Sequence, residues 1–179
     1  LDFAIEKKSD FLAIDLADNE MAVGPEVFAP LFEKAKSEGF AVTIHAGESA
    51  GPRAALNIKN SIEMLHADRI GHGVRILEDP SVLEFVKDRG TVLELCPTSN
   101  WLSGVCSTRE DHPFRAIMDA GIKTTVNTDD PGIMNISLMD EYRLLRDAMG
   151  YTEAEFVQMN SWAREASFLP EAKKASVWP

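Results

Sequence analysis

Short runs of apolar residues recur along the whole chain, and each run ends at a glycine or a polar segment. Runs of about 4–8 such residues are typical of buried strands, and the segments between them carry apolar residues at helical spacing. Strands and helices are therefore predicted to alternate. The predicted strands are residues 11–17, 40–45, 69–71, 91–95 and 122–126, and the predicted helices lie near residues 27–38, 54–66, 79–89, 113–120, 137–149 and 152–166.

This alternation predicts an α/β fold on a parallel sheet, either a (β/α) barrel or a doubly wound sheet. No Gly-x-Gly-x-x-Gly sequence follows a predicted strand, which disfavours a dinucleotide-binding sheet. A complete eight-stranded barrel typically takes about 250 residues, whereas this chain has 179. We therefore expect residues 1–179 to form a single partial domain. It would be the C-terminal portion of a TIM (β/α)8 barrel, with about five β/α units and without the N-terminal strands.

Three predicted strands lead into residues that can bind a metal or transfer a proton. One ends at His45, with Glu48 three positions later; the next leads into His72; the last precedes Asp129 and Asp130. Parallel strands bring their carboxyl ends to one mouth. Each residue alone also has a structural explanation, since Asp-Asp-Pro favours a turn and single strand-end histidines are more often structural. Together they are the parts of metal-assisted hydrolysis, and the ligand types suit zinc.

The charge, cysteine content and hydropathy of the chain limit the kinds of partner and the cellular compartment that we expect. Lys and Arg number 18 against 29 Asp and Glu, a net charge of −11 with His neutral. Such a surface repels phosphate backbones, so we expect no nucleic-acid partner. Two cysteines, Cys96 and Cys106, make no disulfide framework and favour a reducing, cytoplasmic setting. No stretch approaches transmembrane length, so we expect no membrane association.

Four segments at the strand ends carry distinctive motifs: 43–48 (TIHAGE), 69–73 (RIGHG), 94–100 (ELCPTSN) and 127–131 (NTDDP). In their order and spacing, they resemble the motif series of the adenosine deaminase family. Residues 15–17 and 167–170 are similar to flanking segments of the same family. The resemblance covers nearly the whole chain and implies a (β/α)8 barrel with a single catalytic Zn²⁺.

The resemblance implies a role for each strand-end residue. By it, His45 and Asp129 are zinc ligands, and Glu48 is the acid that protonates the purine ring nitrogen as the amino-bearing carbon is attacked. His72 orients the attacking water and helps to deprotonate it, a task within the ordinary range of histidine. Asp130 hydrogen-bonds the water and the imidazole-side nitrogen of the purine. The implied partner is a small-molecule purine nucleoside.

The chain departs from the family pattern in two places. The family carries two zinc-binding histidines as His-x-His on its first barrel strand, and this sequence contains no His-x-His. Two of four ligands cannot close a tetrahedral site, so we expect this chain alone to bind zinc weakly and to lack deaminase activity. Asp18 stands where the family usually has a glycine whose N–H meets the purine, so its side chain is expected to crowd this substrate contact. The other histidines, His66 and His112, are interpreted as structural.

The leading hypothesis is zinc-dependent hydrolysis of adenosine or 2′-deoxyadenosine to inosine or 2′-deoxyinosine and ammonia, a reaction of purine salvage. One alternative is a deaminase of adenine or another 6-aminopurine, which uses the same ring chemistry. Another is a non-catalytic remnant or binding module that keeps the fold. The His-x-Glu and Pro-Cys-x-x-Cys signature of cytidine deaminases is absent, so Cys96 is interpreted as a small buried residue beside the site. Nothing in the sequence indicates the oligomeric state.

Overall fold

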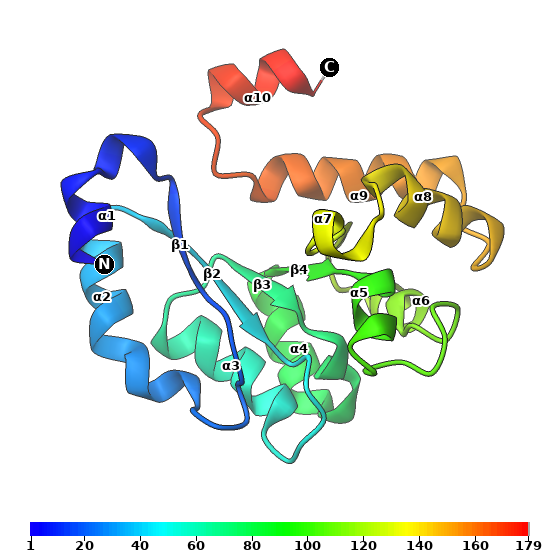
Figure 1. Ribbon diagram of the computed structural model, residues 1–179, viewed down its shortest axis with the longest axis horizontal. Coiled ribbons are helices and arrows are strands. Elements are labelled where there is room, and N and C mark those ends of the chain that lie inside the picture. The colour runs from blue at the N-terminus through cyan, green and yellow to red at the C-terminus, as the bar shows by residue number, and fades with distance from the viewer. Residues whose placement is uncertain (179) are drawn as a thin grey trace.

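A five-stranded parallel sheet forms the centre of the computed structural model, which describes residues 1–178 (Figure 1). The strands pair in chain order, so each lies beside its predecessor. A doubly wound sheet reverses its strand order at a switch point, whereas an unbroken order is that of a barrel wall. The structure confirms the α/β class and the partial-barrel arrangement. The strands are β1 (Ala13–Leu16), β2 (Ala41–Ala46), β3 (Arg69–His72), β4 (Val92–Leu95) and β5 (Thr124–Val126).

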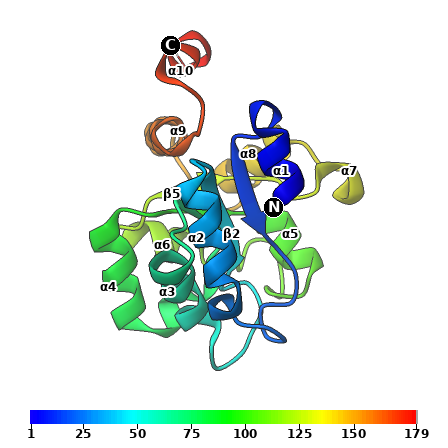
Figure 2. The same ribbon diagram turned by 90° about the vertical axis from the view of Figure 1, so that its left-hand side faces the viewer.

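Helices α2 (Ala29–Ser37), α3 (Ala54–Met64) and α4 (Pro80–Arg89) lie in a row along one face of the sheet (Figure 2). At the other end of the sheet, β5 is contacted by α6 (Phe114–Asp119), α8 (Leu138–Asp147) and α9 (Glu153–Ala166). Across residues 1–178, no helix combines the length and apolar character that crossing a bilayer requires. The remaining helices are α1 (Asp2–Glu6), α5 (Pro97–Leu102), α7 (Pro131–Met134) and α10 (Glu171–Val177), with 3-10 turns at Lys8–Asp10, Pro25–Phe28 and Val74–Glu78.

The ends of α4 show how the sequence sets an element boundary. Asp79 is the N-cap residue, and its Oδ1 accepts hydrogen bonds from the N–H groups of Ser81 at 2.8 Å and Val82 at 3.3 Å. Pro80 occupies the first helical position, where no N–H is needed. Gly90 ends the helix with φ of 65°, a left-handed conformation that favours glycine. The sequence predicts both ends, and the structure confirms them.

Strand β2 separates an apolar face from a polar one. Val42, Ile44 and Ala46 are buried under the helices, whereas Thr43 and His45 are half-buried on the opposite face. Alternate residues of a strand point to opposite faces, so the same short segment supports both the core and the site. The core extends through Phe32, Ile58, Leu65, Ile70, Ile76, Leu93, Leu95, Phe114, Ile117 and Leu145.

Some elements differ from those that the sequence predicts. β1 begins only at Ala13, and the preceding Phe11 and Leu12 are exposed. Residues 97–102 form a helix although Pro-Thr-Ser-Asn is typical of a turn; Pro97 stands at its first position, with φ already suited to a helix. The pattern predicts neither α1 nor α10. These helices have 5 and 7 residues, fewer than the window of about 11 that reveals helical spacing.

Candidate active site

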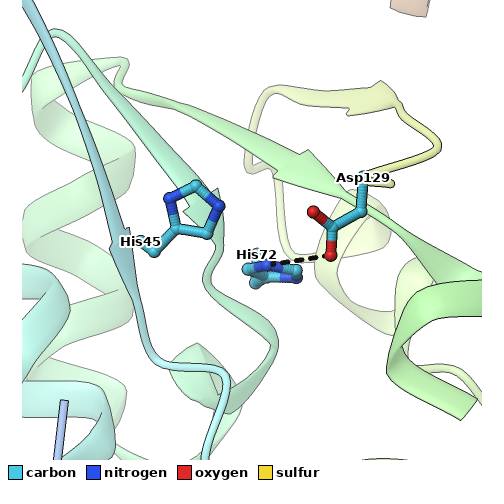
Figure 3. Close-up of side chains that lie close together, drawn as sticks. All are labelled: His45, His72 and Asp129. Atoms are coloured by element: carbon cyan, nitrogen blue, oxygen red, sulfur yellow. Dashed lines mark ion pairs between the residues drawn. The ribbon is translucent and has the colours of Figure 1, made fainter. Parts of the chain in front are cut away.

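Three side chains that can bind a metal meet at the carboxyl ends of β2, β3 and β5 (Figure 3). His45 lies in β2, His72 ends β3, and Asp129 follows β5. Their ligand atoms lie within 4.8 Å of one another, and we call this group the His/Asp cluster. It lines an open pocket of about 380 Å³ together with residues that include Glu94 and Cys96. The structure thus brings together the two residues that the sequence predicts as ligands and the histidine that it predicts as catalytic.

Two members of this cluster have a left-handed backbone conformation. His72 has φ of 62° and Asp129 has φ of 61°, a conformation that costs a non-glycine residue on the order of 1–3 kcal/mol. Gly73 has φ of 72°, and a Cβ there would come within 2.9 Å of a leucine side chain. A Cβ on Gly71 would come within 3.2 Å of the His45 ring. The glycines beside His72 therefore let the chain turn and let the ring of His45 lie against β3.

His45 is held by Asp15 of β1. Its Nδ1 lies 3.2 Å from Asp15 Oδ1 and 3.1 Å from Oδ2, and this hydrogen bond raises the pKa of His45. An Nδ1–H that donates to a carboxylate fixes the ring and leaves the Nε2 lone pair for a metal. The sequence pattern alone does not indicate this role for Asp15, although an acidic residue within a short apolar strand is a signal that points to one.

Glu48 and His72 share the side chain of Asn100. His72 is 2% exposed, and its Nε2 lies 3.6 Å from Glu48 Oε2 and 3.7 Å from Asp129 Oδ2. Asn100 Nδ2 lies 3.1 Å from His72 Nδ1 and 3.2 Å from Glu48 Oε1. Ser103 Oγ donates to the same Glu48 oxygen at 3.3 Å. The residue predicted as the acid is thus half-buried against His72 and oriented by two donors.

Asp129 is oriented from the same helix, α5. Ser99 Oγ donates to Asp129 Oδ2 at 2.7 Å, and Ser99 is itself buried. Adjacent residues of α5, Ser99 and Asn100, therefore position the two carboxylates that flank His72. Both residues belong to a segment that resembles a family motif, but the sequence predicts a turn there, so it does not predict their contacts.

The loop that carries Glu48 is anchored by Glu20. The Glu20 carboxylate accepts hydrogen bonds from the backbone N–H groups of Gly47, Glu48 and Ser49 at 2.8–2.9 Å. It also accepts one from Asn57 Nδ2 at 3.0 Å. Hydrogen bonds to an ionised acceptor are roughly twice as strong as neutral ones. Glu20 therefore fixes the loop after β2, a role that no motif in the sequence indicates.

Two predicted substrate contacts lie outside the His/Asp cluster. Asp18 is exposed and lines a separate hollow of about 170 Å³ after β1, where its Oδ1 accepts a hydrogen bond from the N–H of Asn19 at 2.7 Å. Its φ of 129° lies in the region that favours glycine, which agrees with the family's glycine at this position. Asp130 is exposed and is the N-cap residue of α7. Among residues 1–178, neither belongs to the walls of the cluster's pocket.

Of the residues interpreted as structural, His66 lies on the surface, whereas Cys96 and His112 are buried. His66 is exposed just beyond α3, with φ of 56°. Cys96 is buried in the pocket wall, and burial raises its pKa well above the usual range. His112 is buried, and burial lowers its pKa to about 3. Its Nε2 lies 2.9 Å from Asn100 Oδ1, so it belongs to the support of the site.

The donor atoms of the His/Asp cluster fit a zinc ion. Imidazole nitrogen and carboxylate oxygen are both zinc ligands, and catalytic sites use three protein ligands with an open position. His45 offers Nε2 because Asp15 engages its Nδ1, and Asp129 offers a carboxylate oxygen. His72 Nδ1 is engaged by Asn100. Within residues 1–178 the cluster supplies part of a ligand set.

The fold is similar to solved structures of barrel-type hydrolases. An adenine deaminase from Arthrobacter aurescens matches with a TM-score of 0.91 and 27% identity, over 98% of this chain and 53% of that one. An amidohydrolase from Burkholderia ambifaria, solved with bound Zn, matches with a TM-score of 0.87 and 28% identity, over 98% and 49% of the two chains. The class of protein is the barrel-type amidohydrolase, and this chain has the fold of about half of such a barrel.

The sequence defines the family within this class. The family model described as adenosine deaminase matches residues 2–178. The chain is also 36% identical over 173 residues to the adenosine deaminase of Plasmodium falciparum (isolate 3D7). The aligned region covers 96% of this chain and 47% of that protein. The chain therefore belongs to the adenosine deaminase family. It spans about half the length of the curated relatives it matches.

Proposed function

We propose that this chain is part of a zinc-dependent aminohydrolase of cytoplasmic purine salvage. The reaction converts adenosine or 2′-deoxyadenosine to inosine or 2′-deoxyinosine and ammonia. The observation that carries the proposal is the His/Asp cluster at the strand ends, with the carboxyl group of Glu48 against His72. Membership of the adenosine deaminase family supports it.

Each residue of the mouth has a task in this reaction. His45 and Asp129 would hold the zinc ion, which lowers the pKa of water to about 7 and so supplies a nucleophile at neutral pH. Glu48 donates a proton to the purine ring nitrogen while the amino-bearing carbon is attacked. His72, whose Nε2 faces Glu48 and Asp129, orients the attacking water. Asp130 hydrogen-bonds that water and the imidazole-side ring nitrogen.

The proposal also includes a substrate contact by Asp18 and the extent of the domain. Asp18 presents its backbone N–H to the purine from the loop after β1. Residues 1–179 form a single partial barrel domain, and the remaining zinc ligands come from the complementary wall. The 179 residues alone are then inactive. Measurable turnover by the isolated chain with added zinc would contradict this.

Adenine or another 6-aminopurine is the second candidate substrate. The fold match to an adenine deaminase, with its TM-score of 0.91, favours this alternative. Steady-state rates of the full-length gene product with adenosine, adenine and AMP separate the candidates. The proposal predicts the highest kcat/KM with adenosine, whereas a strong preference for adenine would replace it with the alternative.

A further inference from the structure

A line of buried hydrogen bonds runs from the backbone of α6 to His72. It starts at the N–H of Phe114, which donates to His112 Nδ1 at 3.1 Å. His112 Nε2 lies 2.9 Å from Asn100 Oδ1, and Asn100 Nδ2 lies 3.1 Å from His72 Nδ1. His112, Asn100 and His72 are 3%, 0% and 2% exposed. Bulk water therefore does not compete for these partners.

The first donor in the line sets the direction of the next bonds. A backbone N–H can only donate, so Nδ1 of His112 accepts, and the one proton of its neutral ring sits on Nε2. Burial lowers the pKa of His112 to about 3, which keeps the ring neutral near pH 7. Its Nε2–H needs an acceptor, and the facing atom is Asn100 Oδ1. The amide nitrogen of Asn100 must then face His72.

The amide group of Asn100 connects His112 to the two predicted catalytic residues, His72 and Glu48. Its NH₂ has two protons and two facing acceptors, His72 Nδ1 and Glu48 Oε1. With Nδ1 accepting, the proton of a neutral His72 ring lies on Nε2. That nitrogen faces Glu48 Oε2 at 3.6 Å and Asp129 Oδ2 at 3.7 Å. A reversed amide would set donor against donor at His112.

We propose that His112 and Asn100 are positioning residues that fix His72 as an Nε2–H hydrogen-bond donor toward the pocket. The inference rests on the proposed function and sharpens one part of it. His72 orients the attacking water by donating a hydrogen bond, because the Nε2 lone pair that a proton acceptor needs is absent in this arrangement. Asn100 also sets the orientation of the Glu48 carboxyl group through Oε1.

Long-range ¹H–¹⁵N correlation spectra of the full-length gene product, labelled with ¹⁵N-histidine and free of substrate, test this directly. The His72 signals are assigned by their loss in His72→Gln. In the wild type at neutral pH, Nδ1 of His72 should show the downfield shift of an unprotonated ring nitrogen, and Nε2 the upfield shift of a protonated one. A protonated Nδ1 in the wild type would overturn the proposal.

Two variants of His112 and one of Asn100 test the origin of this tautomer. Asn100→Asp offers only acceptors to His72, so Nδ1 should become protonated and its ¹⁵N signal should move upfield. His112→Gln keeps a donor toward Asn100 and should leave the His72 signals in place. His112→Asn is shorter and loses that donor, so Asn100 is free to turn over and protonation should shift toward Nδ1. Unchanged His72 signals in Asn100→Asp or His112→Asn would overturn the positioning role. Failure to deaminate adenosine with the wild-type tautomer present would instead count against the proposed function alone.

Discussion

The helix-covered face of the sheet and the mouth at its strand ends lie within a few residues of each other, but they are held differently. On the covered face, apolar side chains such as Ile44 and Leu93 are fully buried. At the mouth, polar groups are held by named partners: Asp15 for His45, and Asn100 for Glu48. Apolar cores tolerate swaps of similar volume, whereas a buried hydrogen bond leaves its partner unsatisfied when one side is changed. Stability and chemistry should therefore respond to different substitutions.

The largest effect is expected at the mouth, from Glu48→Gln. The amide cannot supply the proton, so kcat of the full-length gene product should fall by about 10²–10⁴-fold. Steady-state formation of inosine measures it, and the unfolding temperature and the zinc content should stay at wild-type values. Turnover near the wild-type rate would remove Glu48 from the role of acid.

The two faces of β2 allow a matched test of stability. Ile44→Ala opens a cavity under the helices and should lower the free energy of unfolding by about 2–5 kcal/mol. Its neighbour Thr43 faces the other side, where its Oγ1 donates to Glu94 Oε2 at 3.1 Å. Thr43→Ala loses one partly exposed hydrogen bond and should cost about 0.5–1.5 kcal/mol. Chemical denaturation measures the free energy of unfolding of both variants. Equal losses would contradict the claim that the two faces contribute differently to stability.

Glu20→Gln tests whether the mouth depends on its anchoring hydrogen bonds. A neutral amide cannot accept from all three N–H groups of the loop, and its own NH₂ opposes at least one donor. Displacement of the loop with Glu48 should lower kcat by about 10²-fold. Glu26→Gln is the control, since Glu26 pairs with Arg53 at 2.5 Å on the surface. If the two variants have the same kcat, Glu20 does not position the acid.

The smallest expected effect is a pH dependence of stability from His112. Burial lowers its pKa to about 3 in the folded chain, against about 6.5 when unfolded. Below pH 6.5 the unfolded chain binds a proton that the folded chain does not, so stability present above pH 6.5 is lost as the pH falls toward 3. Between pH 7.5 and 5.5 the loss is about 1 kcal/mol. Denaturant titrations at the two pH values measure this loss, which should be about 1 kcal/mol smaller in His112→Gln than in the wild type. The same pH dependence of the free energy of unfolding in both proteins would contradict a buried neutral ring.

Local patterns predict much of the fold and the meeting of the His/Asp cluster. Helix α4 is predicted to within a residue because its signals, Asp79 and Gly90, are adjacent to its ends. The cluster is predicted because parallel strands converge at their carboxyl ends. The supporting contacts of Asp15, Glu20 and Asn100 are not predicted, since each joins residues at least 27 positions apart. Such partners depend on how the loops and α5 settle in three dimensions, which no spacing along the chain encodes.

Metal-dependent deamination of adenosine by the full-length gene product is the most direct test of the central claim. Ammonia release from adenosine is measured in the zinc-loaded protein, after chelation, and after zinc is returned. The same series is run with Asp129→Ala. The account predicts turnover that disappears with the metal and returns with zinc, and a variant that neither retains zinc nor turns over. A zinc-loaded wild type without turnover, or turnover unaffected by chelation, would contradict it.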